Sequence, residues 1–189
     1  MILMRHGESE FNVVYKKTRV DPGIRDPKLT DAGRKQVADA VRYLVDRPIE
    51  RILTSPYTRA LQTASIVAES LRVAVHVDPH IGERAAFACD IGTPDAELRN
   101  QWPDLHLDHI NEQWWPTPIE SEEQLDQRCI HFRHTQSQSE DWQKTLVVSH
   151  WGFIRGLTGH TVDNAQLVEF DPFDTHPGGG AVVPMEFPC

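Results

Sequence analysis

The stretch MILMRHGESEFN, residues 1–12, predicts both the fold and the site of this protein. Met1 to Met4 is a short apolar run, typical of a strand that is buried on both faces. The hydrophobicity stops at Arg5, His6 and Gly7, so the strand delivers an arginine and a histidine to its carboxyl end. Ligands of open α/β sheets bind at this edge. An imidazole beside a guanidinium suits an anion that the histidine could attack, although a strand followed by a polar turn would look similar.

The rest of the chain alternates predicted strands and helices, which is the pattern of an α/β fold. Short apolar runs predict further strands at residues 51–54, 73–77 and 145–148. Helical spacing and capping signals predict helices from the N-cap Thr30 to about residue 46, from Ser55 and Pro56 onward, around residues 95–101, and from Ser121 to about residue 138. We therefore expect a three-layer α/β/α sandwich with a mainly parallel central sheet.

Two segments lack this regular pattern. Residues 13–28 show neither a helical nor a strand period and are predicted to form a long loop. Residues 78–118 are long and irregular, and we expect them to form a cap over the site, with their tryptophans packing the cap onto the domain. A terminal hairpin is predicted from residues 167–170 and 181–184. At 189 residues the chain fits one domain, so we expect a single domain over residues 1–189.

The charge of the chain limits its partners. A formal net charge of −9 disfavours nucleic acid or an anionic membrane as the main partner, because both would be repelled. A phosphate site must then be a local cluster of arginines, which Arg5 and Arg59 could supply. Between residues 13 and 28 the cations Lys16, Lys17, Arg19 and Arg25 could extend that site, or they could form a solvated basic face.

Cysteine content and targeting signals point to a protein of the cytoplasm. The sequence has no apolar run of about 18 residues, and no basic and apolar signal segment precedes the first strand. Cys89, Cys129 and Cys189 are odd in number and lack C-x-x-C spacing, so neither a disulfide framework nor a cysteine zinc site is indicated. We expect reduced thiols and a cytoplasmic location.

A set of short motifs along residues 1 to about 170 resembles the histidine phosphatase superfamily, the phosphoglycerate-mutase-like proteins. Each motif is weak alone, and their order makes the combination specific. They are Arg5-His6-Gly7-Glu8-Ser9, Asn12, Leu29-Thr30-x-x-Gly33, Ser55-Pro56-x-x-Arg59-Ala60-x-Gln62-Thr63-Ala64, Glu83 and Ser149-His150-x-Gly152. The segment from Glu83 to Cys89-Asp90-x-Gly92 is similar to the branch of small phosphatase-like members. Residues 21–27, DPGIRDP, depart from the Phe-Thr-Gly-Trp type of segment found in the mutases.

The resemblance implies a phosphatase that works through a phosphohistidine. Arg5 and Arg59 can each bind two phosphate oxygens, and Asn12 and His150 can donate further hydrogen bonds. His6 is then free to attack phosphorus as a neutral imidazole, which needs neither a metal nor a cofactor.

A carboxyl group must protonate the leaving group and later activate water. The family match assigns this role to Glu83. From the residues alone, Asp78, Asp90 or Glu97 could serve as well.

The expected function is a metal-independent phosphatase for a small phosphorylated substrate. A phosphoglycerate-type mutase is the alternative within the same chemistry, and a non-catalytic phospho-ligand-binding protein is the alternative outside it. The pairs His106/His109 and His131/His134 could each share a helical face, but without a third ligand they do not indicate a metal site. The sequence names neither the substrate nor the oligomeric state.

Overall fold

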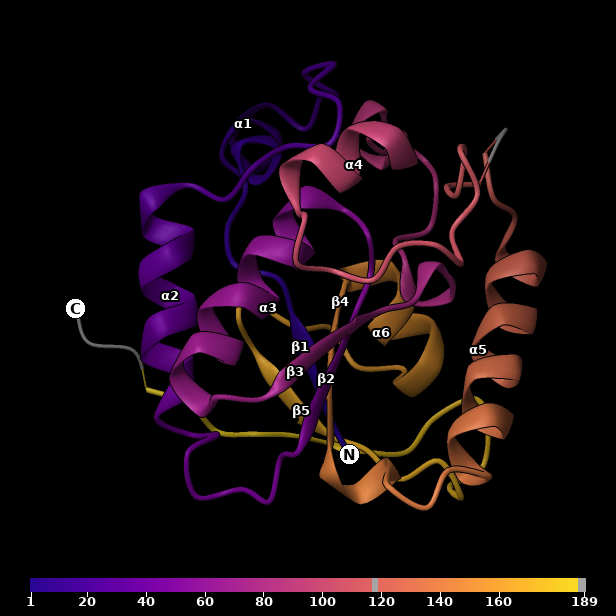
Figure 1. The fold of residues 1–189 in the computed structure, drawn as a ribbon. Coiled ribbons are helices and arrows are strands. Elements are labelled where there is room, and N and C mark those ends of the chain that lie inside the picture. The colour runs from indigo at the N-terminus through magenta and orange to yellow at the C-terminus, as the bar shows by residue number, and fades with distance from the viewer. Residues whose placement is uncertain (117–118, 187–189) are drawn as a thin grey trace.

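The fold is built on a six-stranded sheet, seen in a computed structural model that describes residues 1–116 and 119–186 (Figure 1). The strand order is β3-β2-β4-β1-β5-β6. The bonded pairs β3-β2, β2-β4 and β4-β1 are parallel, and β5 and β6 add antiparallel pairs at one edge. The strands are β1 (Ile2–Arg5), β2 (Arg51–Thr54), β3 (Ala74–Val77), β4 (Thr145–Ser149), β5 (Leu167–Glu169) and β6 (Ala181–Val182).

Helices cover both faces of the sheet, so the predicted three-layer α/β/α sandwich is confirmed. In Figure 1, α2 (Asp31–Val41) and α3 (Thr58–Leu71) lie on one side of the strands, and α5 (Glu122–Ser137) and α6 (Trp151–Thr158) lie on the other. The first strand serves both layers because alternate side chains of a strand point to opposite faces. Ile2 and Met4 pack with the α2/α3 side, whereas Leu3 packs with the α5/α6 side.

The predicted loop at residues 13–28 is wrong in its first third, because residues 10–18 form a helix. Helix α1 (Glu10–Thr18) starts at the N-cap Ser9, whose hydroxyl accepts the backbone N–H of Asn12, while the Asn12 side chain accepts the N–H of Ser9. This is a reciprocal capping box. Only Phe11 of the helix is buried, which explains why no apolar stripe is visible in the sequence.

Two predicted helix ends also differ from the structure. Helix α3 begins at Thr58 with Tyr57 as its N-cap, so the prediction of Ser55 as N-cap is wrong. Helix α2 ends at Val41, and the turns that follow it were included in the predicted helix. By contrast, the capping box of Ser121 and Gln124 opens α5 as expected, and α4 (Asp95–Gln101) and the β5/β6 pair are confirmed.

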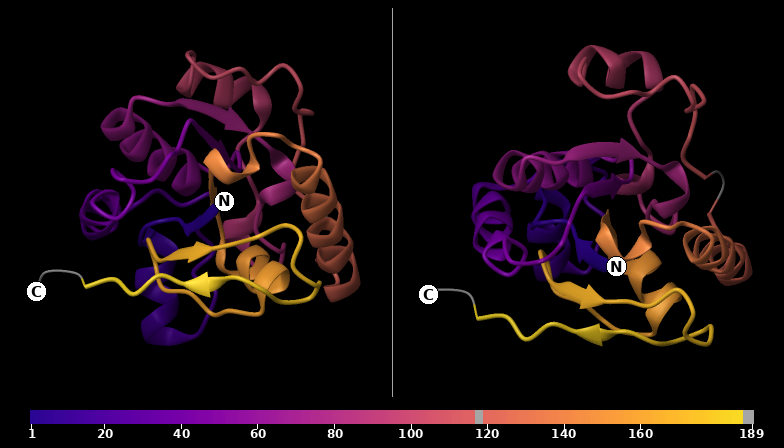
Figure 2. Two further views of the ribbon diagram at one scale, coloured as in Figure 1. Left: turned by 90° about the horizontal axis from the view of Figure 1, so that it is seen from below. Right: turned by 60° about the horizontal axis from the view of Figure 1, so that its bottom comes forward.

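The long segment between β3 and α5 lies beside the sheet, next to β3 (Figure 2). It contains the 3₁₀ turns η1 (Pro79–Ile81) and η2 (Ala88–Asp90) as well as α4, and a third such turn, η3 (Trp142–Lys144), precedes β4. Leu98, Leu107 and Ile110 pack onto residues of α3 and β3, with Trp102 and Trp114 against this cluster. Residues 117 and 118, the end of the predicted cap, lie outside the described residues.

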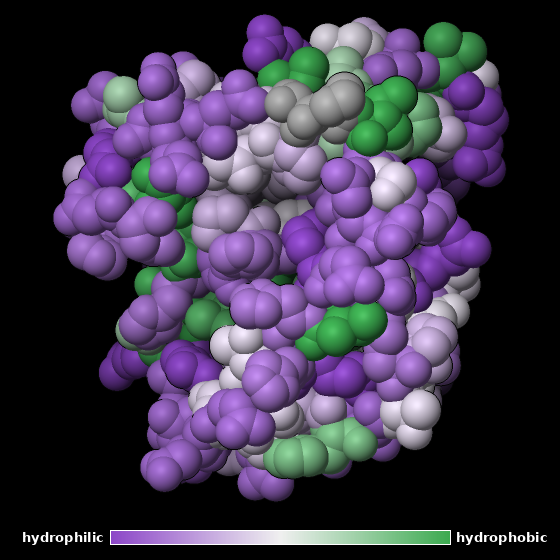
Figure 3. Space-filling view, turned by 90° about the vertical axis from the view of Figure 1, so that its right-hand side faces the viewer, coloured by the Kyte–Doolittle hydropathy of each residue, from purple (hydrophilic) through white to green (hydrophobic). Residues whose placement is uncertain are grey.

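The surface and the thiols show ordinary features. Seen from the α5 side, the surface is mostly hydrophilic and its hydrophobic residues are scattered (Figure 3). Among the described residues, no helix combines the length and apolar character needed to cross a bilayer. Cys89 and Cys129 are buried free thiols, and Cys189 lies outside the described residues.

Candidate active site

The carboxyl ends of three parallel strands bring the predicted site residues together. Arg5 at the end of β1 is in register with Ser149 of β4, and Thr54 of β2 is in register with Val148. His6 and His150 therefore follow neighbouring strand ends, and their ring centroids are 5.2 Å apart. The structure thus places both imidazoles at one edge of the sheet, as the two strand-histidine motifs predict.

His6 is held in the tautomer that a nucleophile requires. Its Nδ1 lies 2.7 Å from the carbonyl oxygen of Gly7. A carbonyl can only accept a hydrogen bond, so Nδ1 carries the proton and Nε2 carries the lone pair. Burial, followed by the charges of Arg59 and Arg5, lowers the pKa of His6 well below its ordinary value. The imidazole is therefore neutral at physiological pH.

The backbone just after His6 packs closely against the start of α2, and a glycine is required on each of these two segments. A Cβ atom on Gly7 would lie 2.5 Å from the carbonyl oxygen of Gly33 in α2, and one on Gly33 would overlap the backbone of Glu8. The backbone N–H of Gly7 also donates to the hydroxyl of Thr63 in α3. The start of α2 and the first half of α3 thus fix the backbone that carries His6.

His150 and Arg5 each carry a buried polar atom without a hydrogen-bond partner among the described residues. Nε2 of His150 lies 2.5 Å from the hydroxyl of Ser55, and a serine that donates there leaves the ring proton on Nδ1. Burial, followed by the charge of Arg59, lowers the pKa of His150 well below its ordinary value. His150 Nδ1 and Arg5 Nε are both buried without a hydrogen-bond partner among the described residues. Buried donors are normally paired, so two unpaired donors at this edge of the sheet are consistent with an anionic ligand.

Arg59 is a buried cation that the protein holds rigidly. Its Nη1 donates to the Cys89 carbonyl oxygen at 2.8 Å, and its Nη2 lies 3.2 Å from Oδ1 of Asp90. The guanidinium carbon also lies 4.5 Å from the ring centroid of Tyr57. Burial alone would lower the pKa of Arg59, but the neighbouring acidic groups, Asp90 foremost among them, together outweigh it and raise the pKa. Arg59 therefore offers a fixed positive charge beside His6.

Glu83 is a half-buried carboxyl group that lines the same cavity as His6. Its Oε1 accepts the backbone N–H groups of Arg84 at 2.9 Å and Gly152 at 2.7 Å. A Cβ atom at position 152 would collide with that oxygen, so the glycine of the Ser149-His150-x-Gly152 motif makes room for Glu83. Burial and the charge of Asp90 raise the pKa of Glu83, and the charge of Arg59 offsets part of the rise.

The other carboxyl candidates lie elsewhere or are already occupied. Asp90 is buried against Arg59, and its second oxygen accepts the backbone N–H groups of Ala86 and Phe87. Asp78 caps the turn η1, and the exposed Glu97 bonds to Gln101 on α4. Neither Asp78 nor Glu97 lines the cavity.

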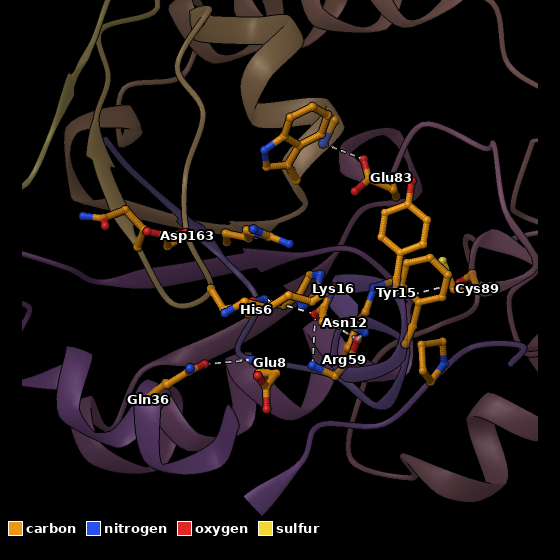
Figure 4. Close-up of a pocket in the computed structure, with 18 of the residues that line it drawn as sticks. His6, Glu8, Asn12, Tyr15, Lys16, Gln36, Arg59, Glu83, Cys89 and Asp163 are labelled. Atoms are coloured by element: carbon orange, nitrogen blue, oxygen red, sulfur yellow. Dashed lines mark hydrogen bonds between the residues drawn. The ribbon is translucent and has the colours of Figure 1, made fainter. Parts of the chain in front are cut away.

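The site opens into a cavity of about 1040 Å³. Asn12 lines it from α1, and the Oδ1 atom of Asn12 is used by Ser9 and Asn164. Lys16 and Arg19 also line it, whereas Lys17 and Arg25 do not. Further lining residues include Arg5, His6, Glu8, Tyr15, Arg59, Glu83, Cys89, Asp90, Asp163 and Asn164. In Figure 4, Tyr15 and Cys89 lie to one side of His6, and Gln36 and Asp163 lie to the other.

Sequence reasoning missed three supporting residues. Asn164 donates to the carbonyl oxygen of His6 and to Asn12 from the loop before β5, where no motif marks it. Ser55 belongs to a motif but was predicted to cap a helix, and its hydroxyl instead meets His150 across 95 positions of sequence. Asp90 was considered only as an acid, although it is the partner of Arg59.

The chain matches the profile of the histidine phosphatase superfamily, branch 1, over residues 1–186. This protein belongs to the histidine phosphatase superfamily. The predicted resemblance is therefore confirmed, and the match covers nearly the whole chain.

Two of the relatives in sequence are phosphatases by name. The glucosyl-3-phosphoglycerate phosphatase of Mycolicibacterium vanbaalenii is 28% identical, over 87% of this chain and 76% of its own. The adenosylcobalamin/alpha-ribazole phosphatase of Salmonella typhimurium is 29% identical, over 89% and 83%. A solved mycobacterial glucosyl-3-phosphoglycerate phosphatase superposes with a TM-score of 0.64 at 22% identity, covering 89% of this chain and 88% of the other. The structural likeness supports the phosphoglycerate-mutase-like fold.

The histidine pairs noted in the sequence do not assemble into a larger cluster. His106 and His109 lie in a turn region, where their ring centroids are 5.7 Å apart, and Nε2 of His109 lies 2.7 Å from the carbonyl oxygen of Val77. Across residues 1–116 and 119–186, no group of three or more His, Cys, Asp or Glu side chains is arranged to hold a metal ion. Both pairs stay outside the site described above.

Replacing Arg59 is expected to lower phosphate release by a factor on the order of 10² or more, because a fixed charge beside the phosphate oxygens would be lost. The assay is kcat/KM for p-nitrophenyl phosphate with Arg59→Ala, and the exposed Arg34→Ala serves as control. Arg59→Ala leaves Asp90 buried without its partner, so the thermal unfolding midpoint should fall as well. A folded Arg59→Ala protein within about threefold of wild type would place Arg59 outside the site.

Proposed function

We propose that this protein is a phosphomonoesterase that transfers the phosphoryl group of a small substrate to His6. The single observation that supports this most directly is the bond between His6 Nδ1 and the Gly7 carbonyl oxygen, because it leaves the lone pair on Nε2. A nucleophile so fixed, beside Arg5 and Arg59, suits attack on a phosphate whose oxygens are neutralised. The two relatives named above, both phosphatases, support the same reaction class.

In the first step, Nε2 of His6 attacks phosphorus in line with the leaving oxygen. The new N–P bond forms as the P–O bond to the leaving group breaks, and the protonated carboxyl of Glu83 gives its proton to that oxygen. Arg5, Arg59, Asn12 and His150 bind the phosphoryl oxygens. The positive charge of the phosphorylated ring is stabilised by the hydrogen bond from Nδ1 to the Gly7 carbonyl.

In the second step, water replaces His6 at phosphorus. The carboxylate of Glu83 takes a proton from the water as its oxygen attacks, and the N–P bond breaks. Inorganic phosphate leaves, Glu83 is protonated again, and His6 returns to its neutral form. The raised pKa of Glu83 favours a carboxyl that can act first as an acid and then as a base.

The segment 78–118 enters this proposal as the cap. Its part near Glu83, Ala86, Phe87 and Cys89 lines the cavity, whereas Leu98, Leu107 and Ile110 pack beside α3. The first part would therefore contact substrate, and the second would anchor it. A single domain over the chain and a cytoplasmic location remain predictions.

Hydrolysis and isomerisation are separated by one experiment. With 3-phosphoglycerate as substrate, the ratio of 2-phosphoglycerate formed to phosphate released is measured with and without bisphosphoglycerate. Hydrolysis of p-nitrophenyl phosphate is measured alongside, and both assays contain excess EDTA. We expect phosphate release to dominate and to survive the chelator, because the arginines neutralise the phosphate oxygens.

Three outcomes would contradict the proposal in different ways. Isomerisation faster than phosphate release would establish the mutase alternative. An absence of turnover with p-nitrophenyl phosphate would favour the non-catalytic phospho-ligand-binding protein. Activity lost with EDTA and restored by zinc or magnesium would make the reaction metal-dependent.

A further inference from the structure

Three aromatic side chains form one wall of the cavity. Phe11 and Tyr15 of α1 stack with ring centroids 5.1 Å apart, and Phe87 packs on both, at 5.6 Å from Phe11 and 5.2 Å from Tyr15. All three residues line the same cavity as His6. We call Phe11, Tyr15 and Phe87 the aromatic wall.

The aromatic wall is tied to the residues that would bind phosphate. Phe11 directly precedes Asn12 on α1, so the helix sets the spacing between the ring and the amide. On the other side, the backbone N–H of Phe87 donates to Oδ2 of Asp90 at 3.0 Å, while Oδ1 of Asp90 holds Arg59. The wall therefore keeps a fixed position relative to the phosphate site.

The aromatic wall is only partly buried, because Phe11 is buried while Tyr15 and Phe87 keep exposed surface. None of its residues belongs to the three buried hydrophobic clusters found among the described residues. Phe87 is 40% exposed and Tyr15 is half-buried, although both rings are large and apolar. A ligand that covers apolar surface beside a charged site removes that surface from water, which stabilises the complex. Aromatic faces and edges favour flat ring systems in particular.

We propose that the aromatic wall binds a flat, aromatic or heteroaromatic leaving group, so that the preferred substrates are phosphate monoesters carrying such a ring. This inference rests on the proposed function, because the phosphate must sit between His6 and Arg59 for the rest of the substrate to reach the wall. The assignment comes from three rings that face the cavity and are fixed to its phosphate-binding residues.

Equilibrium binding of phosphonates tests the inference without requiring turnover. Benzyl- and 3-phenylpropylphosphonate are compared with propylphosphonate by titration calorimetry, since a carbon–phosphorus bond is not hydrolysed by a phosphomonoesterase. We expect the better phenyl compound to bind wild type about tenfold more tightly than propylphosphonate. Phe87→Ala should remove most of this preference. Phe173→Ala is the matched control, because Phe173 is also exposed but does not line the cavity.

A second variant is needed in case Phe87→Ala changes the conformation of the segment around it. Tyr15→Leu changes the wall from α1 and should also reduce the phenyl preference at least threefold, with thermal unfolding as a check on folding. Equal dissociation constants of the phenyl and propyl compounds in wild type would overturn the inference. So would a preference that persists in both Phe87→Ala and Tyr15→Leu. A tenfold preference in a protein that releases no phosphate would support the wall and overturn the proposed function instead.

Discussion

Alanine at position 6 is expected to reduce phosphate release by a factor on the order of 10⁴ or more, the scale seen when the nucleophile of a covalent mechanism is removed. Nε2 of His6 is the only atom in the proposed reaction that bonds to phosphorus before water does. The measurement is kcat for p-nitrophenyl phosphate. Wild type mixed with labelled substrate and quenched in alkali should carry an acid-labile phosphate, which His6→Ala should lack.

The matched control for this experiment is His106→Ala. His106 is an exposed histidine outside the cavity, so its loss should leave both the rate and the labelling unchanged. His6 is buried and its substitution creates a void, so the unfolding midpoint of His6→Ala must be measured as well. A folded His6→Ala protein that keeps a tenth of the wild-type rate would rule out the phosphohistidine mechanism.

Periodicity predicted the layers of this fold because the core strands are short apolar runs with alternate faces. Ile2, Leu3 and Met4 illustrate this, since all three are buried and they divide between the two helix layers. The same method failed for α1, which buries only Phe11. Its sequence signal was the cap of Ser9 and Asn12, where asparagine stands in place of the usual glutamate or glutamine.

The candidate site was predictable where a strand ends in a reactive side chain. His6 and His150 follow β1 and β4, and parallel strands bring their carboxyl ends to one edge. Arg59 was also visible, because an arginine in the first turn of a helix opposes the helix dipole.

The supporting contacts were not predictable because they cross long distances in the sequence. Ser55 reaches His150, and Asp90 reaches Arg59 across 31 positions. No local pattern marks such a pair. Three-dimensional packing brings Glu83 and Asp90 to the cavity and pairs Asp90 with Arg59, which favours Glu83 for the proposed acid.

Changing Glu83 to glutamine is expected to lower kcat/KM about 10³-fold for an alkyl phosphate, because an alkoxide leaves badly without a proton donor. The same variant should lose much less kcat/KM on p-nitrophenyl phosphate, whose phenolate leaves without protonation. This quantity reports the steps up to phosphorylation of His6, so the contrast isolates the acid role from the later base role. Glu97→Gln, an exposed change outside the cavity, is the control.

The pH dependence provides the second half of this test. Glu83 must be protonated in the first step, so kcat/KM for the alkyl phosphate should fall as pH rises through the pKa of Glu83. Burial and the charge of Asp90 raise that pKa, so the fall should come at a higher pH than for an ordinary carboxyl. Ionisation of the substrate affects wild type and variant alike, and the fall caused by Glu83 should vanish in Glu83→Gln. An equal loss on both substrates, or an unchanged profile, would show that another group donates the proton.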